Sequence, residues 1–212
     1  MRILVTGANR GIGAALVEAA RDAGHEMIAA TRPGSGGDIE FDVTDHAALG
    51  RAAASLGALD ALINNAGIIG PARQSPLDMD FAGFREVLEV NTLAPLAVAQ
   101  AFLPNLRRGT APRILSVSSQ MAWMGYAKSD RIAYRASKVA LNKVMQGLAT
   151  DLAPEGIAVG VVDPGCVRTD MGGPEAEEDP DDVARGILAV AEKLAPQLGG
   201  RFWSWRGEVR DY

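Results

Sequence analysis

Cysteine is almost absent from this chain, because Cys166 is the only one among 212 residues. A single cysteine excludes an internal disulfide and a cysteine-rich metal site. The two histidines, His25 and His46, lie in polar stretches and are expected at the surface. We therefore expect no structural metal.

A basic excess and long apolar runs are also missing. The formal net charge is −5 and no cluster of lysine and arginine stands out, which argues against nucleic acid and anionic membranes as partners. We expect no apolar run of transmembrane length, and the first residues resemble a strand rather than a signal sequence. These features predict a cytoplasmic protein.

What remains is an ordinary globular composition. The 212 residues are 48% apolar and 22% charged, which is enough for a complete hydrophobic core. The chain is too short to hold a second large domain. We therefore expect a single domain that spans residues 1–212.

Short apolar, β-branched runs alternate with helix-length segments along the chain. Such alternation predicts crossover connections and an α/β fold, in which a mostly parallel sheet is covered by helices on both faces. This is the doubly wound, Rossmann-type sandwich, here with about seven strands. The expected strands are residues 3–5, 27–30, 38–41, 61–63, 113–117, 158–162 and 201–205.

Three glycines follow the first strand and open a helix. Gly7, Gly11 and Gly13 suit a tight turn, a close approach of backbone to a ligand and close packing of the helix on the sheet. The N–H groups and the dipole at the helix start favour a phosphate. The turn therefore predicts a dinucleotide pyrophosphate site, although many glycine-rich turns bind nothing, and these residues alone leave the two alternatives even.

Polar, glycine or proline residues, of the kinds that bind ligands, follow six consecutive strands. In sheets of this kind, ligands bind beyond the carboxyl ends of the strands. One such strand end is compatible with chance, whereas six along one edge argue for an extended ligand. The six segments are residues 7–13, 31–32, 42–43, 64–67, 118–119 and 163–169.

Arg32 bears on the choice of dinucleotide. An acidic residue at the end of the second strand would bind a ribose 2′-hydroxyl, whereas a guanidinium prefers a 2′-phosphate. Arg10, inside the glycine turn, is a candidate for a second positive charge nearby. NADP is therefore favoured over NAD. The alternative is that both arginines are solvated surface charges.

Residues 80–106 form a helical pattern in which Asn91 interrupts an apolar stripe. Pro95 has no N–H to donate, so the helix is expected to loosen about one turn before it. Two interpretations of Asn91 stay open. In one, its side chain satisfies the loosened backbone; in the other, the loosened turn holds a water near the active site; the two are compatible.

Tyr134 and Lys138 lie one helical turn apart on an inward-facing stripe. A nearby ammonium stabilises a phenolate, which would lower the tyrosine pKa from its usual value near 10 and make it a usable acid or base. A serine hydroxyl opposite would bind the same substrate oxygen. The structural alternative is a core tyrosine with a snorkelling lysine; the six strand ends favour the catalytic interpretation.

These motifs together resemble the short-chain dehydrogenase/reductase family over nearly the whole chain. Short segments such as AYRASK, DLAPEGI and RTDMGG are most similar to its compact carbonyl-reductase-like branch, which includes the sniffer and C-factor proteins. The motifs are TGANRGIG at residues 6–13, NNAG at 64–67, Asn91, SS at 118–119, YRASK at 134–138 and PGCVRT at 164–169.

The resemblance implies a role for each matching residue. Tyr134 would be the general acid in reduction, Ser119 would orient the carbonyl, and Asn91 would hold a proton-relay water. Lys138 would bind the nicotinamide ribose and lower the pKa of Tyr134. It also implies a homodimer or homotetramer. The implied cofactor-binding residues are Gly7, Asn9, Arg10, Gly11, Ile12, Gly13, Arg32, Asp42, Val43, Asn65, Ala66, Gly67, Tyr134, Lys138, Pro164, Gly165, Val167 and Thr169.

Three features depart from the family pattern. The interval from Ser119 to Tyr134 is slightly longer than usual, which leaves Ser118 as an alternative; aligning residues 124–125 favours Ser119 and places the extra residues near 126–131. Cys166 stands where a tryptophan is expected, which predicts a roomier nicotinamide pocket. The segment after Thr169 is short, which predicts a small lid and an open site.

The sequence thus predicts a single dinucleotide-binding and catalytic domain. Its function would be NADPH-dependent reduction of a small-molecule carbonyl, or oxidation of the matching alcohol, by a Ser-Tyr-Lys site. The alternative is a dinucleotide-binding signalling or scaffold protein with little turnover, since fold likeness alone does not establish function.

Overall fold

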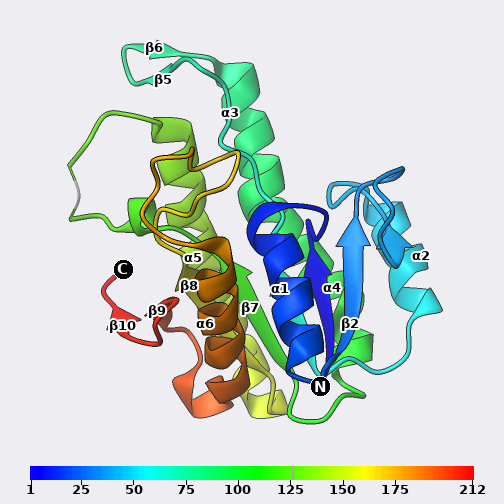
Figure 1. Ribbon diagram of the computed structural model, residues 1–212. Coiled ribbons are helices and arrows are strands. Elements are labelled where there is room, and N and C mark those ends of the chain that lie inside the picture. The colour runs from blue at the N-terminus through cyan, green and yellow to red at the C-terminus, as the bar shows by residue number, and fades with distance from the viewer. Residues whose placement is uncertain (126) are drawn as a thin grey trace.

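A computed structural model describes residues 1–125 and 127–212 (Figure 1). Within them, eight strands form one sheet in the order β3-β2-β1-β4-β7-β8-β9-β10, parallel throughout except for the last pair. This confirms the expected α/β fold with a mostly parallel sheet. The strands are β1 (Arg2–Thr6), β2 (Glu26–Thr31), β3 (Ile39–Glu40), β4 (Ala61–Asn64), β7 (Arg113–Val117), β8 (Ala158–Asp163), β9 (Phe202–Ser204) and β10 (Val209–Arg210).

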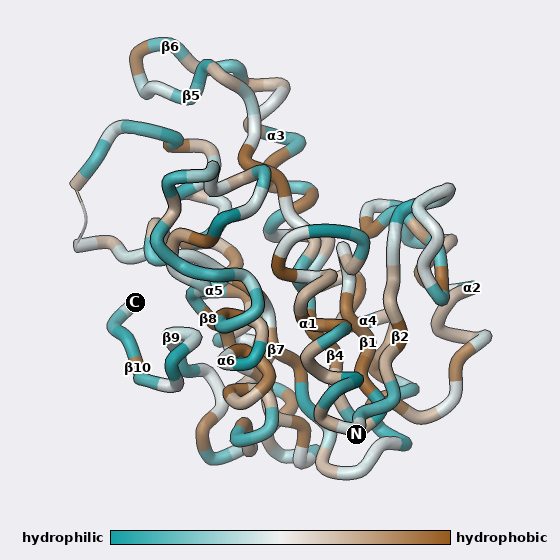
Figure 2. Tube along the Cα trace, in the orientation of Figure 1, coloured by the Kyte–Doolittle hydropathy of each residue, from teal (hydrophilic) through white to brown (hydrophobic). Residues whose placement is uncertain are grey.

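Helices cover both faces of the sheet. Side chains alternate along a strand, so in β1 Ile3 and Val5 pack toward one face while Leu4 packs toward the other. On the first face lie α1 (Gly11–Asp22) and α6 (Pro180–Lys193), side by side in Figure 1. On the second lie α2 (His46–Ser55), α4 (Ala94–Leu106) and α5 (Ile132–Leu152). Figure 2 shows the apolar residues gathered on the central strands between these layers.

The helix N-termini differ in how they are capped. Asp45 caps α2 by accepting a hydrogen bond from Ala48 N, and Asp179 caps α6 through Asp181 N. Such caps satisfy N–H groups that have no partner inside the helix. Arg10, at the start of α1, supplies no side-chain cap. The first turn of α1 therefore keeps its N–H groups available to a ligand.

The helical pattern over residues 80–106 loosens where Pro95 predicts. It comprises α3 (Phe81–Leu88), a π-helical turn η1 (Glu89–Leu93) and α4. Pro95 has no N–H for the carbonyl four residues earlier, so the preceding turn widens and Ala94 N bonds to Glu89 O instead. The expectation of a loosened turn at Asn91 is confirmed.

The expectation about apolar runs is wrong for this same segment. Phe81–Leu106 is long and apolar enough to cross a membrane by length and composition alone, with a mean hydropathy of 1.3 over its most apolar window. The helix is apolar because one side of it is core: 44% of that window is buried inside the structure. Val98, Phe102 and Leu106 belong to the core on the second face of the sheet, so the run is explained by packing.

Three short strands were not predicted from the sequence. β5 (Gln74–Ser75) and β6 (Asp78–Met79) form an antiparallel hairpin that extends beyond α3 (Figure 1). β10 adds an antiparallel edge to the main sheet. A strand of two residues is too short to display an alternating pattern, which needs at least four residues.

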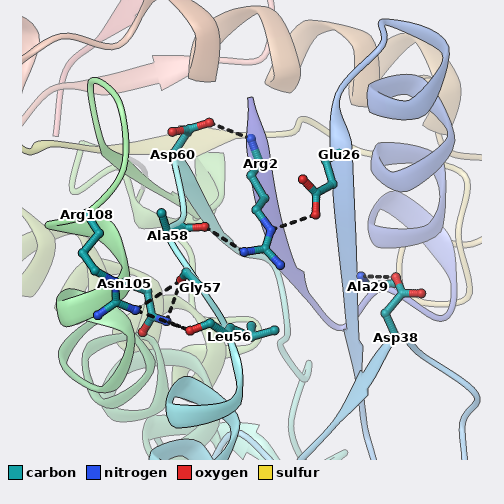
Figure 3. Close-up of polar contacts among 10 residues, drawn as sticks. All are labelled: Arg2, Glu26, Ala29, Asp38, Leu56, Gly57, Ala58, Asp60, Asn105 and Arg108. Atoms are coloured by element: carbon teal, nitrogen blue, oxygen red, sulfur yellow. Dashed lines mark hydrogen bonds and ion pairs between the residues drawn. The ribbon is translucent and has the colours of Figure 1, made fainter.

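At the amino edge of the sheet, polar side chains are engaged with backbone and with each other (Figure 3). Arg2 donates to Glu26 Oε1 at 2.8 Å and to Ala58 O at 3.1 Å, and its own N–H donates to Asp60 Oδ2 at 2.7 Å. Asn105 Nδ2 donates to Gly57 O at 2.9 Å. These groups hold loops at this edge, whereas the predicted cofactor-binding residues follow the strands at the opposite edge.

The two histidines differ in exposure. His46 is exposed, as expected. His25 is only 14% exposed, because it lies between the amino terminus at 3.1 Å and Glu192 at 2.9 Å. The expectation of a surface position is therefore wrong for His25, whose polar sequence neighbours say nothing of these distant partners.

Candidate active site

The glycine turn leaves no room for side chains. Gly7 and Gly11 have positive φ angles of 65° and 53°, a region that glycine adopts readily. A Cβ on Gly13 would lie 2.2 Å from Gly7 O, and one on Gly7 would lie 2.9 Å from the Ala66 Cα. The glycines thus let the backbone of the turn pack closely on itself and on Ala66, in front of the uncapped start of α1. This arrangement suits a phosphate group.

The segment after β4 is tied to this turn by hydrogen bonds. Thr6 Oγ1 accepts from the N–H groups of Asn65 and Ala66, both at 3.1 Å. Asn65 Nδ2 donates to the carbonyl oxygens of Thr6 and Gly7 at 3.0 and 3.1 Å. The sequence analysis named Thr6 only as the first residue of the TGANRGIG motif and gave it no role of its own. Thr6 fixes the relative positions of two predicted cofactor-binding segments.

The Ser119 side chain lies close enough to Tyr134 to lower the pKa of the tyrosine. Both are buried, with exposed fractions of 7% and 8%. Ser118 turns away and donates from Oγ to Asn142 Oδ1 at 2.6 Å. Of the two serines, Ser119 is therefore the one that faces the tyrosine.

The pKa of Tyr134 lies higher than we expected. Burial raises it to about 12, outweighing the hydrogen bond from Ser119, which lowers it. The negative charge of Asp163 raises it further, and the positive charge of Arg131 lowers it. The expected lowering is thus wrong for the protein alone, because desolvation disfavours a phenolate more strongly than these neighbours favour it.

Lys138 lies one turn along α5 from Tyr134, with its Nζ 5.7 Å from the centre of the tyrosine ring. The ammonium is buried and donates to Val117 O at 2.8 Å. Burial lowers its pKa to about 8. A Cβ on Gly67 would lie 3.7 Å from this Nζ, so Lys138 borders the segment after β4.

Asn91 is fully buried, and its side chain binds the backbone of the segment after β4. Its Oδ1 accepts from Ile68 N at 2.9 Å, and its Nδ2 donates to Ile68 O at 2.8 Å and to Ser137 Oγ at 3.1 Å. The interpretation that this side chain satisfies the loosened helix backbone is therefore wrong. A water held by the turn itself stays a prediction, and the missing N–H of Pro95 leaves the Asn91 carbonyl without its usual helical donor.

The charged residues that follow β1, β2 and β3 differ in their surroundings. Arg32 is exposed directly after β2. The pKa of Asp42 is lowered by hydrogen bonds from Thr44 and also by the charge of Arg32. Arg10 forms an ion pair with Asp170 at 2.7 Å, both side chains being largely exposed. The charge of Arg10 is thus shared with a carboxylate from the loop after β8.

That loop approaches the glycine turn from the other side. A Cβ on Gly11 would lie 3.2 Å from the Thr169 methyl group. Gly165 has a φ of 74°, Val167 is buried and Cys166 is exposed. A cleft of about 680 Å³ runs beside it, lined by residues 67–71, Arg10, Asp170, Met171 and the start of α3.

Comparisons with known proteins agree with this geometry. The family model described as short chain dehydrogenase matches residues 34–180. This chain belongs to the short-chain dehydrogenase/reductase family. The assignment made from its motifs is confirmed.

Individual relatives of this short-chain dehydrogenase/reductase include reductases. "C-signal" of Myxococcus xanthus is 42% identical over 71% of this chain and 91% of its own length. The crystal structure of an NADPH-bound carbonyl reductase from chicken fatty liver matches 100% of this chain and 98% of that one, with a TM-score of 0.90 and 30% identity. Carbonyl reductase Sniffer of D. melanogaster matches 100% and 99%, with a TM-score of 0.89 and 28% identity. The chain is thus an oxidoreductase of carbonyl-reductase-like type.

In this short-chain dehydrogenase/reductase the predicted cofactor residues follow five strands along one edge. Asn9, Ile12 and the three glycines follow β1, Arg32 follows β2, and Asp42 and Val43 follow β3. Residues 65–67 follow β4, and Pro164, Gly165, Val167 and Thr169 follow β8. Their placement suits one extended ligand.

The sequence analysis missed Gln74, a buried residue of β5. Its Oε1 accepts from Tyr134 N at 3.0 Å, while its Nε2 donates to Ile69 O at 2.9 Å and Pro71 O at 2.7 Å. Gln74 therefore caps the start of α5 from outside the helix and links Tyr134 to the cleft wall. No local pattern in the sequence marks this residue.

Proposed function

We propose that this protein is an NADPH-dependent carbonyl reductase, or in reverse an alcohol dehydrogenase, acting on a small molecule. The observation that carries the proposal is the buried pair of Tyr134 and Ser119, in which the serine side chain lowers the pKa of the tyrosine, with Lys138 one turn away. The residues fit a nicotinamide dinucleotide, because Gly13 leaves a side-chain-free turn and α1 begins without a side-chain cap. Arg32 supplies a cation where a 2′-phosphate would lie.

The bound dinucleotide would supply the hydride that reaches the carbonyl carbon. Tyr134 donates its proton to the carbonyl oxygen, and its pKa of about 12 keeps that proton in place at neutral pH. The Ser119 hydroxyl donates a hydrogen bond to the same oxygen. Lys138 stabilises the phenolate left behind, and a proton from solvent restores the phenol. The carbonyl thereby gains one hydride and one proton and becomes an alcohol.

The mechanism is tested by Tyr134→Phe, measured as NADPH oxidation with a panel of aldehydes, ketones and quinones. We expect turnover to fall by a factor of about 100 or more, because a general acid is lost, while NADPH binding followed by fluorescence is unchanged. Tyr212→Phe is the matched control, since Tyr212 bonds to Gly200 O at the end of the chain. A Tyr134→Phe variant with full activity would sink the mechanism.

The preference for NADPH is tested separately at Arg32. Arg32→Asp replaces a cation that suits a 2′-phosphate with an anion that repels it and accepts from a 2′-hydroxyl. We expect the ratio of kcat/KM for NADPH to that for NADH to invert. Arg108→Asp, at the amino edge of the sheet (Figure 3), is expected to leave the ratio unchanged. A wild-type protein that prefers NADH would refute this assignment.

A second candidate function is favoured by one observation, the 42% identity to "C-signal" of Myxococcus xanthus. In this alternative the protein binds a dinucleotide and acts as a signalling or scaffold protein with little turnover. It predicts tight NADPH binding, no reduction of any carbonyl in the panel, and a protein partner in pull-down experiments. The buried Tyr134–Ser119 pair supports the reductase instead, since a sensor has no need of it.

We further infer a homodimer or homotetramer in the cytoplasm that binds neither nucleic acid nor membranes. The acidic net charge of −5 supports the last two statements. Analytical ultracentrifugation tests the assembly, with a monomer at micromolar concentration as the contrary result.

A further inference from the structure

We propose that Asp163 and Arg210 are positioning residues for the Ser119–Tyr134 pair: the Asp163 carboxylate holds the two loops around that pair, and Arg210 balances its charge. The inference deepens the proposed reductase function and rests on it. Neither residue belongs to the motifs that identify the family site. Asp163 precedes the PGCVRT segment, and Arg210 lies near the end of the chain.

The Asp163 carboxylate lies at the junction of two active-site loops. Asp163 ends β8 and is only 1% exposed. Its Oδ1 accepts from Gln120 N at 2.8 Å and from Gly165 N at 2.9 Å. Gln120 directly follows Ser119, and Gly165 opens the loop that faces the glycine turn. One oxygen therefore fixes the serine loop relative to the loop after β8.

The other carboxylate oxygen is bound by the last strand. Arg210 Nη1 donates to Asp163 Oδ2, and the Arg210 side chain is 41% exposed. The main chain is joined as well, because Trp205 N donates to Asp163 O at 2.9 Å. The β9–β10 hairpin, near the label C in Figure 1, thus delivers a guanidinium to the base of the active site.

A charged residue at position 163 is not required by the two backbone hydrogen bonds. A neutral amide oxygen would accept them without the cost of burying a carboxylate. The buried charge is tolerated because two N–H groups and a guanidinium bind it. Its presence therefore suggests an electrostatic effect on the neighbouring tyrosine in addition to a mechanical one.

The charged groups around Tyr134 come from four segments. Lys138 lies on the same helix, Arg131 precedes it, Asp163 comes from β8, and Arg210 stands behind Asp163 on β10. The charge of Asp163 raises the pKa of Tyr134. Arg210 opposes that effect through its ion pair. Removing the charge of Asp163 should therefore lower the pKa of Tyr134, and removing the charge of Arg210 should raise it.

The experiment compares Asp163→Asn with Arg210→Gln. Ionisation of Tyr134 is followed by NMR of labelled tyrosine ζ-carbons, with and without NADP⁺; the chain has 3 tyrosines, and Tyr134→Phe assigns the signal. We expect the pKa of Tyr134 to fall in Asp163→Asn and to rise in Arg210→Gln. The pH profile of kcat/KM for alcohol oxidation should shift in the same directions.

Two further variants separate positioning from general damage. Arg210→Lys keeps the positive charge and should restore the wild-type titration. Arg206→Gln removes an arginine next to the same hairpin, one that pairs with Glu178 at 3.1 Å, and should leave the titration unchanged. The mechanical role is tested by Asp163→Ala, which removes the acceptor of both backbone hydrogen bonds: for carbonyl reduction at neutral pH, we expect it to lower kcat by a factor of roughly 10 through a misplaced Ser119, with little change in the KM for NADPH.

The possible results divide clearly. Opposite shifts in the two variants, with Arg210→Lys restoring the titration, support the proposal. Shifts of the same sign, or no shift, overturn it even if stability falls. Because the NMR titration needs no turnover, an inactive wild-type protein would refute the reductase function while leaving this test in place.

Discussion

Lys138 Nζ donates to Val117 O at 2.8 Å and thereby links α5 to the strand that leads to Ser119. The lysine is buried, with 5% of it exposed, and burial lowers its pKa to about 8. The same group that the mechanism needs as a cation is therefore held in surroundings that disfavour its charge. That conflict has a measurable consequence for stability.

We expect the free energy of unfolding to rise with pH between about 8 and 10.5 through Lys138. In the folded protein its pKa is about 8, whereas the ordinary lysine pKa of 10.5 applies to the unfolded chain. Between these values the unfolded chain binds more protons, so stability increases with pH, by up to about 1.4 kcal/mol per unit. Urea unfolding of wild type and Lys138→Met over this range checks the prediction.

Lys143→Met is the control for this experiment. Lys143 is exposed on the same helix and donates to Gln146 Oε1, so its removal should leave the slope unchanged. The difference in stability between wild type and Lys138→Met should change steadily with pH. Parallel curves for these two proteins would contradict the burial of a charged lysine.

The two adjacent serines are expected to respond differently to substitution. Ser119→Ala removes the hydroxyl that faces Tyr134 and should lower kcat for carbonyl reduction by a factor of roughly 100. Ser118→Ala instead leaves Asn142 Oδ1 without its donor, which should cost about 1–3 kcal/mol of stability and leave kcat near wild type. Steady-state kinetics and urea unfolding of both variants test this. Equal losses of kcat would show that Ser118 also takes part in the reaction.

The sequence predicted those features that depend on neighbouring residues. The glycine turn, the strand ends and the spacing of Tyr134 and Lys138 are local patterns, and the rule for parallel sheets brings the strand ends to one edge. Pro95 likewise acts on its own helix, and the loosened turn lies where it was expected. Local chemistry therefore sufficed for the fold and for the core of the candidate site.

Contacts between distant residues had no such signal. Gln74 reaches Tyr134 across 60 positions, and Arg210 reaches Asp163 across 47. Neither pair shares a helix face or a strand register that a periodicity would reveal. The pKa of Tyr134 was missed for a related reason, since its direction depends on how deeply the whole fold buries the ring. Such features require the assembled structure.

Gly13 provides a test of dinucleotide binding at the glycine turn that does not depend on catalysis. A Cβ at this position would lie 2.2 Å from Gly7 O and 2.6 Å from Asn65 Nδ2. Because the nearest atom is backbone, relief requires movement of the turn itself. Gly13→Ala should cost about 1–3 kcal/mol of stability, as overpacking does, and should weaken NADPH binding at least tenfold by fluorescence titration.

Gly50→Ala is the matched variant, because Gly50 lies inside α2 with nothing within 4 Å of its Cβ position. Alanine there should raise stability by about 0.5–1 kcal/mol through its better helix propensity, with NADPH binding unchanged. The two substitutions are chemically identical, so the comparison isolates the effect of position. A Gly13→Ala protein that binds NADPH as tightly as Gly50→Ala would show that the turn does not contact the dinucleotide, and the assignment of the pyrophosphate to this turn would have to be abandoned.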